Sequence, residues 1–263
     1  LVGMLLMVYN LAKTMMIGKP VANEEAQAAP IHKEEKEKVS HRWLEGKPIY
    51  FMVLALVVVL IGGIVELVPT FLVKSNIPTI ASVKPYTSLE LQGRDLYIRE
   101  GCNNCHSQLV RPFRSETERY GEYSKAGEYV YDHPFLWGSK RTGPDLHREG
   151  GKYPNLWHYL HMENPRSMSP GSIMPPYPWL LENTLDISLM PNKINAMRSL
   201  GVPYPDGYEN QARDDLMKQA EAIALDLQKN GAPAEPDKEI IALIAYLQRL
   251  GTDIKVKPVV ENR

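Results

Sequence analysis

The longest apolar segment of the chain lies in its first third. Residues 49–65 include no charged residue, and apolar positions continue beyond Glu66 and Pro69 as far as Val73. A helix needs about 20 apolar residues to cross the hydrocarbon core of a bilayer, and this segment is long enough. We therefore predict a transmembrane anchor helix over residues 48–73. The alternative for so apolar a segment is a buried helix of a globular domain.

Basic residues are distributed unequally around this segment. Those near it are Lys33, Lys36, Lys38, Arg42 and Lys47 on the N-terminal side, and Lys74 and Lys84 on the C-terminal side. Lys and Arg gather on the cytoplasmic side of membrane helices. We therefore predict that residues 18–47 form a cytoplasmic linker. Everything after about residue 74 is then expected outside the cytoplasm, in an oxidising compartment.

A shorter apolar stretch, LVGMLLMVYN, opens the sequence at residues 1–10. It is too short to cross a bilayer alone, and it lacks the basic start and small-residue cleavage site of a signal peptide. We interpret residues 1–17 as the end of an upstream transmembrane helix, with an interfacial N-terminal helix as the alternative. The linker that follows has mixed charges and few large apolar residues, so it has little to bury.

Helical periodicity dominates the rest of the chain, and no strand alternation of any length appears. Residues 74–87 contain Pro78 and Pro85 and are predicted to be a linker, and Ser88 is the candidate N-cap of the first helix. The clearest amphipathic pattern is at 237–250. The predicted helices are 88–100, 156–162, 192–200, 209–230 and 237–250, with 107–183 mostly loop. We therefore expect a mainly α domain over residues 88–252, followed by a tail at 253–263.

Charge and cysteine content exclude several classes of function. The formal net charge is −1 and no block of basic residues stands out, so a nucleic-acid partner is not expected. The chain has two cysteines, three positions apart, which excludes a framework of several disulfides. A zinc site built mainly from thiolates would need more cysteine ligands than these two.

The two cysteines stand in Cys102-Asn103-Asn104-Cys105-His106, the C-x-x-C-H pattern of covalent haem attachment. This spacing allows two thioethers to fix the haem on one turn of chain, and it places the histidine beneath the iron as an axial ligand. The alternative is a redox dithiol of the thioredoxin kind. That fold needs a strand before the motif and a helix after it, whereas here a helix precedes the motif and a loop follows. We therefore predict one covalently attached haem c.

The sixth ligand of the iron has several candidates. Met174 stands before Pro-Pro-Tyr-Pro, in a loop that the prolines stiffen, at a plausible distance after the attachment motif. A thioether ligand raises the reduction potential and leaves no open site for O₂, which suits an electron relay. We favour Met174, with Met168 as the next choice. The further candidates are Met162, Met190, His133, His147, His158 and His161.

Two predicted helices have a small residue and aromatic residues on facing sides. Gly93 and Tyr97 share one face of the first helix, and Leu243 and Tyr246 share one face of the last. A small residue against an aromatic ring allows two helices to cross closely, as in the helix pair of class I cytochromes c. We therefore predict a class I cytochrome c-like domain. Independent packing of the two helices is the alternative.

Several motifs in order then resemble the mono-haem cytochrome c subunit of cbb3-type cytochrome c oxidases, over about residues 48–250. They are GCNNCHSQLVRPF (101–113), YGEYS (120–124), RTGPDL (141–146), NPR (164–166) and MPPYPWL (174–180), with GGIVELVP (62–69) in the anchor. Asn103 departs from the family, in which an aromatic residue is common at that position. Residues 183–235 match weakly. Residues 1–14 resemble the end of the last helix of the catalytic subunit, which favours a fragment of a fused polypeptide.

The resemblance implies a role and a set of partners. Cys102 and Cys105 would attach the haem, and His106 and Met174 would be its axial ligands. Electrons would arrive from a di-haem cytochrome c subunit or a soluble cytochrome c. They would pass to haem b of the catalytic haem–copper subunit of a proton-pumping oxidase, which reduces O₂ to water. The cytochrome subunit of a nitric oxide reductase is the related alternative, and a membrane-anchored thiol-disulfide oxidoreductase is the alternative from another class.

Several polar residues near these motifs are candidates for further roles. Arg111 and Arg141 are candidates to pair with haem propionates, as are Arg114 and Lys140 nearby, and solvated surface charge is the alternative for each. Ser139 is a candidate for a contact between subunits. A metal site is conceivable at His158 and His161, at positions i and i+3 of one helix. Structural hydrogen bonding is the favoured interpretation of that pair.

Overall fold

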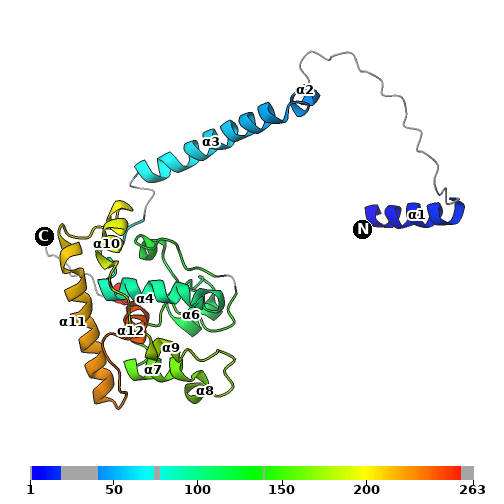
Figure 1. The fold of residues 1–263 in the computed structure, drawn as a ribbon. Helices are drawn as coiled ribbons and strands as arrows, with labels where there is room; N and C mark the ends of the chain where they lie inside the picture. Colours follow the sequence, from blue (N-terminus) through cyan, green and yellow to red (C-terminus); the bar gives the residue numbers. More distant parts are fainter. Residues whose placement is uncertain (1, 19–40, 74–77, 139, 256–263) are drawn as a thin grey trace. The chain divides into compact units, whose positions relative to one another are not determined.

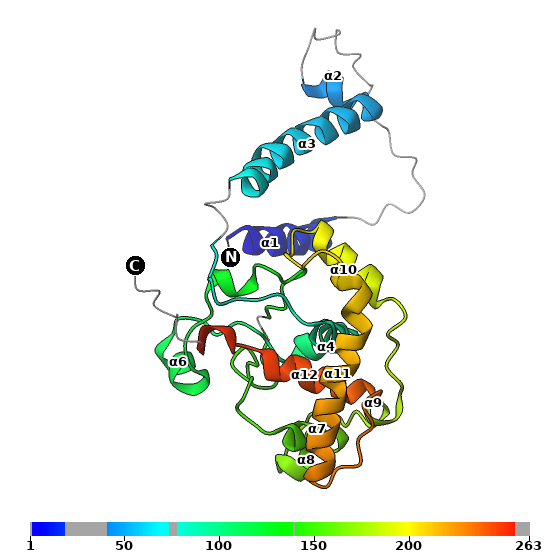
Figure 2. The ribbon, with the colours of Figure 1, turned by 90° about the vertical axis from the view of Figure 1, so that its left-hand side faces the viewer.

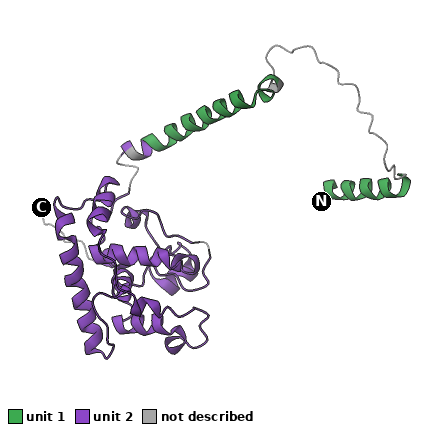
Figure 3. Ribbon diagram, viewed as in Figure 1, with its two compact units in different colours: residues 1–68 green, residues 69–263 purple. Residues whose placement is uncertain are grey.

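A computed structural model of the chain describes residues 2–18, 41–73, 78–138 and 140–255. Most of the predicted linker at 18–47, part of the linker at 74–87, Ser139 and most of the tail at 253–263 therefore lie outside the described residues. The chain divides into two compact units, Leu1–Val68 and Pro69–Arg263 (Figure 3). Each unit is described by itself.

The described residues of the first unit form helices α1 (Val2–Ile17), α2 (His41–Glu45) and most of α3 (Pro48–Leu72). Within α3, Pro48–Thr70 is long and apolar enough to cross a membrane, and none of its most apolar window is buried against protein. A helix that is apolar all round and unburied is suited to lipid. The Lys47 ammonium lies 4.4 Å from the Trp43 ring centroid just before α3 begins. The predicted anchor helix is confirmed as the one candidate membrane span among the described residues.

The second unit is mainly helical, and its described residues form no strand beyond an isolated bridge between Thr184 and Lys238 (Figure 1). All the longer predicted helices are present, within a few residues of their expected ends. They are α4 (Ser88–Arg99), α7 (Asn155–Glu163), α10 (Met190–Ser199), α11 (Tyr208–Lys229) and α12 (Glu239–Arg249). Short elements not predicted are α5 (Cys102–Cys105), α6 (Arg114–Tyr120), α8 (Pro165–Met168), α9 (Trp179–Glu182), η2 (Ala126–Tyr129) and η3 (Asp253–Lys255).

The N-cap of α4 differs from the prediction. Thr87, not Ser88, is the cap: its Oγ1 accepts a hydrogen bond from the backbone N–H of Glu90, and the Glu90 carboxylate accepts one from the backbone N–H of Thr87. This reciprocal pair is a capping box. Ser88 is fully buried in the first helical position instead, where its hydroxyl lies 2.9 Å from that of Tyr208.

Helices α4 and α12 cross closely at Gly93. A Cβ atom built on Gly93 would lie 1.9 Å from the carbonyl oxygen of Ala242 and 2.8 Å from Cβ of Tyr246, so only glycine fits. The Tyr97 and Tyr246 rings meet edge to face with centroids 5.4 Å apart. The Arg99 guanidinium also binds the Glu239 carboxylate with two bonds of 2.6 Å. The predicted crossing of the first and last helices is confirmed.

Helix α11 covers the α4–α12 pair and also contacts α7 and α10 (Figure 2). Its buried side is a stripe of small and aliphatic residues at helical spacing: Ala212, Leu216, Ala220, Ala224 and Leu227. Thr87 Oγ1 donates to Gln219 Oε1 at 2.7 Å, and Tyr204 donates to the carbonyl of Tyr86 at 2.7 Å. The weakly matching segment 183–235 therefore completes the core.

Candidate functional site

The attachment motif forms the short helix α5 directly after α4. Gly101 makes the turn between them with a φ of 69°, in the left-handed region that favours glycine. Cys102 is half-buried, Cys105 is exposed, and the two are not joined in a disulfide. Burial, and to a smaller extent the nearby Glu100, raises the pKa of the Cys102 thiol to about 12. A redox dithiol needs a lowered thiol pKa, so this environment disfavours that chemistry.

The imidazole of His106 is held in one orientation from two sides. Its Nδ1 lies 2.8 Å from the Pro144 carbonyl oxygen, which accepts the proton of that nitrogen. A Cβ atom built on Gly143 would lie 2.2 Å from Cε1 of the ring, so the glycine backbone packs directly against it. Burial lowers the pKa of His106, which favours the neutral ring. A neutral imidazole with Nδ1 engaged offers Nε2 to a metal.

The loop that supplies Gly143 and Pro144 is fixed by the buried carboxylate of Asp145. This carboxylate accepts hydrogen bonds of 2.9 Å from the backbone N–H groups of Leu109 and His147. It also accepts one of 3.3 Å from Arg141. A charged acceptor with several donors ties the segment after the motif to the proline loop. Residues 102–106 and 142–146 together are the attachment wall.

Residues 169–177 form an opposing segment, the methionine wall, which includes Met174. The backbone N–H of Met174 donates to Ser172 Oγ at 3.2 Å, and the N–H of Tyr177 donates to the carbonyl of Met162 at 2.8 Å. The second bond ties the segment to α7. Ile173, next to Met174, remains 76% exposed.

A cavity of about 540 Å³ lies between the two walls. Cys102, Cys105, His106 and Met174 all line it, so the residues predicted to hold a haem are brought together. Several aliphatic and aromatic side chains also line it, from the two walls, from the segment before α7 and from helices α4, α7 and α12. They are Tyr97, Leu146, Tyr153, Trp157, Met162, Tyr177, Leu243 and Leu247.

The cavity fits a haem. Its volume is within the range of about 300–1,000 Å³ typical of cofactor sites, and its lining is largely apolar with few polar groups. Two free thiols, an oriented imidazole and a thioether are the donors that a c-type haem uses. The glycine at 143 leaves the space that the His106 ring needs, because any larger residue would displace it.

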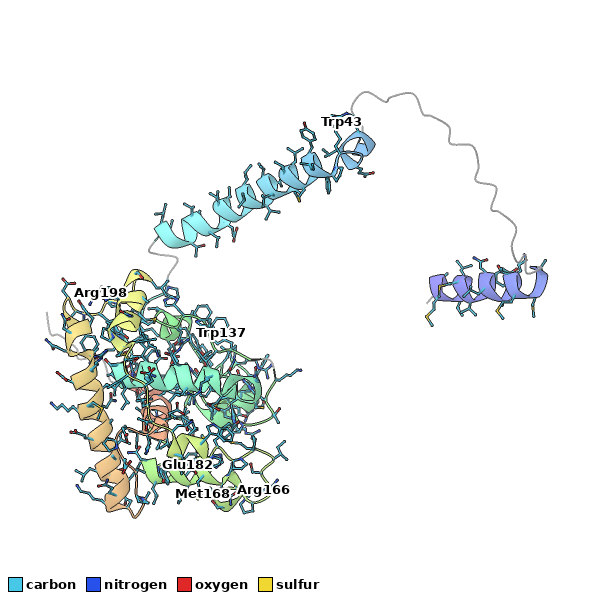
Figure 4. The ribbon with its side chains drawn as sticks, viewed as in Figure 1. Trp43, Trp137, Arg166, Met168, Glu182 and Arg198 are labelled. Carbon is cyan, nitrogen blue, oxygen red and sulfur yellow. The ribbon has the colours of Figure 1, made fainter. Side chains whose placement is uncertain are left out.

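The other candidates for the sixth ligand separate into two groups. Met162, His158 and His161 line the cavity, whereas Met168, Met190, His133 and His147 do not. Figure 4 places Met168 at the outer edge of the domain, near Arg166. Within the described residues, no group of three or more His, Cys, Asp and Glu side chains is arranged to hold a metal ion.

The two arginines predicted to contact haem propionates do not line the cavity. Arg111 and Arg141 both bind the carboxylate of Glu116, at 2.5 and 2.8 Å. Arg141 also donates to the carbonyl of Leu109 at 2.5 Å. Their guanidinium groups are engaged in fixing the loop after the attachment motif, so this geometry gives the propionate prediction no support.

Sequence reasoning missed several lining residues on the segment that leads into α7. Glu149, Lys152, Tyr153 and Trp157 all border the cavity. Tyr153, Trp157 and His161 form a stacked column, with centroids 4.1 and 4.4 Å apart. Their spacing of four residues could have predicted this column, because residues four apart share one face of a helix.

Comparison with known proteins identifies the family. A family model described as the mono-haem subunit of cytochrome c oxidase, FixO, matches residues 41–254. No curated protein matches the chain. The match includes the anchor helix α3, both walls of the cavity and α12. It covers most of the sequence, so the chain belongs to the FixO family, the mono-haem subunits of cbb3-type cytochrome c oxidase.

Proposed function

We propose that this chain relays single electrons through one haem c that is attached covalently at Cys102 and Cys105. His106 and Met174 are its axial ligands in this proposal. One observation carries it: these four residues, from two separate segments, line the same largely apolar cavity. The chain belongs to a family of oxidase subunits, which supports electron transfer as the function of the site.

A haem bound in this cavity supplies the one-electron couple of its iron. The residues of the chain determine how that couple behaves. The two cysteines fix the ring position, and Pro144 keeps His106 in the tautomer that presents Nε2. The Met174 thioether favours the ferrous state and closes the site to O₂. The aliphatic and aromatic side chains, with Leu243 and Leu247 from α12, would give the ring largely apolar surroundings.

The partners follow from the family. The chain is a subunit of a cytochrome c oxidase, so its acceptor is within that complex. We infer that electrons arrive from the di-haem cytochrome c subunit or a soluble cytochrome c. They then pass to haem b of the catalytic haem–copper subunit, where O₂ is reduced to water with proton pumping. The match to an oxidase family favours this over a nitric oxide reductase, and the raised pKa of Cys102 disfavours a thiol-disulfide oxidoreductase.

The decisive test is a pyridine haemochrome spectrum of the full chain, with haem staining of denaturing gels. The parent should contain one covalently bound haem c per chain. The double variant Cys102→Ala/Cys105→Ala should lose all covalent haem, because no thiol remains to form a thioether. Asn103→Ala is the matched control, since Asn103 lies between the cysteines without a proposed role. A stained band at full mass in the double variant contradicts the proposal.

The orientation in the membrane has its own test. We propose that the cavity domain is periplasmic in the bacterial inner membrane, because more cations lie in the segment just before α3 than in the segment just after it. Protease added to spheroplasts should digest the domain after residue 88 and leave residues 18–47 intact. If the domain after residue 88 is digested only after the cells are broken, the orientation is the opposite of the one proposed.

A further inference from the structure

One part of the cavity lining is polar and comes from residues 149–153. Glu149, Lys152 and Tyr153 border the cavity there. The segment is tied to the C-terminal end of α12, because the N–H of Gly150 donates to the Leu250 carbonyl at 2.9 Å. Gln248 Nε2 also donates to the carbonyl of Tyr153 at 2.8 Å.

The cysteines approach the cavity from the other end of α12. Arg99, the last residue of α4, binds Glu239, the first residue of α12, through two bonds of 2.6 Å, and Cys102 begins the next helix. The 11 residues of α12 extend about 16 Å between these two attachments. That length is comparable with the long dimension of a haem. The cysteines and the polar segment 149–153 therefore face each other across the cavity.

The two edges of a haem differ in chemistry. One edge carries the vinyl groups that react with cysteine thiols, and the opposite edge carries two propionate carboxylates. A haem attached at Cys102 and Cys105 accordingly directs its anionic edge toward Glu149, Lys152 and Tyr153. Carboxylates entering a partly apolar site need a cation or hydrogen-bond donors to compensate their lost hydration.

Lys152 is the one lysine or arginine among the described residues that line the cavity. Its ammonium lies 3.7 Å from the buried Glu149 carboxylate and 5.1 Å from the Tyr153 ring centroid. His158, which also lines the cavity, supplies no charge at neutral pH, because burial lowers its pKa to about 4.

We propose that Lys152 is the cation that binds the haem propionates, with Glu149 and Tyr153 holding its side chain at the cavity. The inference rests on the proposed haem site. It replaces Arg111 and Arg141, whose guanidinium groups bind Glu116 away from the cavity. A cation beside the ring disfavours the more positive ferric state, so Lys152 raises the reduction potential.

The test compares two variants of the full chain that each remove one positive charge, Lys152→Gln and Arg111→Gln. Both side chains are about half exposed, at 46% and 50%, and in Arg111→Gln the Glu116 carboxylate keeps its bond to Arg141. We expect Lys152→Gln to lower the reduction potential and to shift the propionate bending band in the resonance Raman spectrum. Arg111→Gln should leave both unchanged. Lys152→Arg keeps the charge and should restore the potential toward that of the parent.

Haem content, measured first in every variant, separates the two proposals. A parent chain without covalent haem overturns the proposed function. A parent with haem, in which Lys152→Gln moves neither the potential nor the Raman band, overturns this inference alone. A shift in Arg111→Gln without one in Lys152→Gln also overturns it, and reassigns the propionates to the arginine loop. If Lys152→Gln loses its haem, Lys152→Arg decides the question. The parent spectrum and potential in Lys152→Arg support the role of the charge, and an altered potential in Lys152→Arg opposes it.

Discussion

The two walls of the cavity are built differently. The attachment wall is backed by buried polar groups: the Asp145 side chain is fully buried, and Ser107 and Gln108 behind it are 0% and 2% exposed. The carbonyl of His106 accepts a hydrogen bond from Tyr97, and that of Gln108 accepts one from Tyr129. The methionine wall has fewer such supports, and much of it is exposed.

This difference separates two tasks that one cofactor site has to perform. The attachment wall has a fixed backbone and oriented side chains, which hold the imidazole and the thiols in place with or without a bound cofactor. The methionine wall lies opposite, in a loop that prolines stiffen. It contributes a proposed ligand but few contacts that hold the fold together. We expect changes in the attachment wall to reduce haem attachment and folding together, and changes in the methionine wall to alter the potential of a folded chain.

The largest effect is expected from Gly143→Ala. The added methyl group would lie 2.2 Å from the His106 ring, so the ring or the loop has to move. Overpacking of this kind costs about 1–3 kcal/mol of unfolding free energy, and here it also displaces a proposed ligand. We expect a loss of most covalent haem and a lower melting temperature, measured by haem staining and circular dichroism.

Gly171→Ala is the matched control in the methionine wall. Gly171 has a φ of 80°, but nothing lies within 4 Å of a Cβ built there. Alanine at a positive φ should cost about 1 kcal/mol and leave haem attachment intact. If both variants keep their haem equally well, the attachment wall is not the more constrained of the two.

A smaller effect on the fold, but a large one on the potential, is expected from Met174→Leu. The side-chain volumes are similar, so the unfolding free energy should change by less than about 1.5 kcal/mol. Covalent haem should remain while the thioether is lost. We expect disappearance of the sulfur-to-iron absorption band at the red edge of the ferric spectrum, and a lower midpoint in a redox titration. Met174→His should keep a low-spin haem at a lower potential.

The competing methionines are the controls. Met168→Leu should change neither the band nor the potential, because Met168 does not line the cavity. Met162 does line it, and it is buried in the core cluster, so Met162→Leu tests the nearest alternative thioether. Loss of the band in Met162→Leu, with retention in Met174→Leu, would show that the ligand comes from α7.

The smallest effect on the haem site is expected behind the attachment wall, at Glu128, which does not line the cavity and acts on stability alone. Although burial raises its pKa, hydrogen bonds from His147 and Arg148 lower the pKa of Glu128 to about 2. A depressed carboxyl pKa stabilises the fold above the unfolded value of about 4.5, and this stability is lost as pH falls toward 2. Allowing for solvent screening, the contribution is about 1–2 kcal/mol.

Glu128→Gln should therefore lower stability at pH 7 and flatten its dependence on pH between about 4.5 and 2. Denaturant titrations of parent and variant across this range measure the effect. Glu118→Gln is the control, because Glu118 is exposed on α6, where its partner is Arg114. Parallel pH profiles for the parent and Glu128→Gln would assign the acid sensitivity to other carboxylates.

The sequence was sufficient to predict the features that depend on local pattern. The anchor follows from length and hydropathy, and the α4–α12 crossing follows from Gly93 and Tyr246 on facing helices. The placement of Cys102, His106 and Met174 around one cavity was expected from the motif and the proline-rich loop. Their chemical roles remain predictions until haem is measured.

The features that were missed depend on the path of loops. Arg111 is five positions after His106 but faces Glu116, whereas Lys152, much farther along the chain, reaches the cavity. No periodicity encodes this, because the route of residues 107–138 and 140–153 is set by buried groups such as Asp145 and Asp132, whose carboxylate binds Arg94 of α4 at 3.1 Å. Thr87 and Ser88 are both good capping residues, and the choice between them depended on Tyr208, more than 100 residues away.

The Arg99–Glu239 pair joins residues 140 positions apart, and it has a consequence for the order of assembly. Because synthesis begins at the N-terminus, the two cysteines are made long before α12. Until α12 arrives, Leu243 and Leu247 are missing from the lining and the cleft stays open on that side. We therefore expect the cleft to be more accessible before α12 packs against α4 than after it has packed.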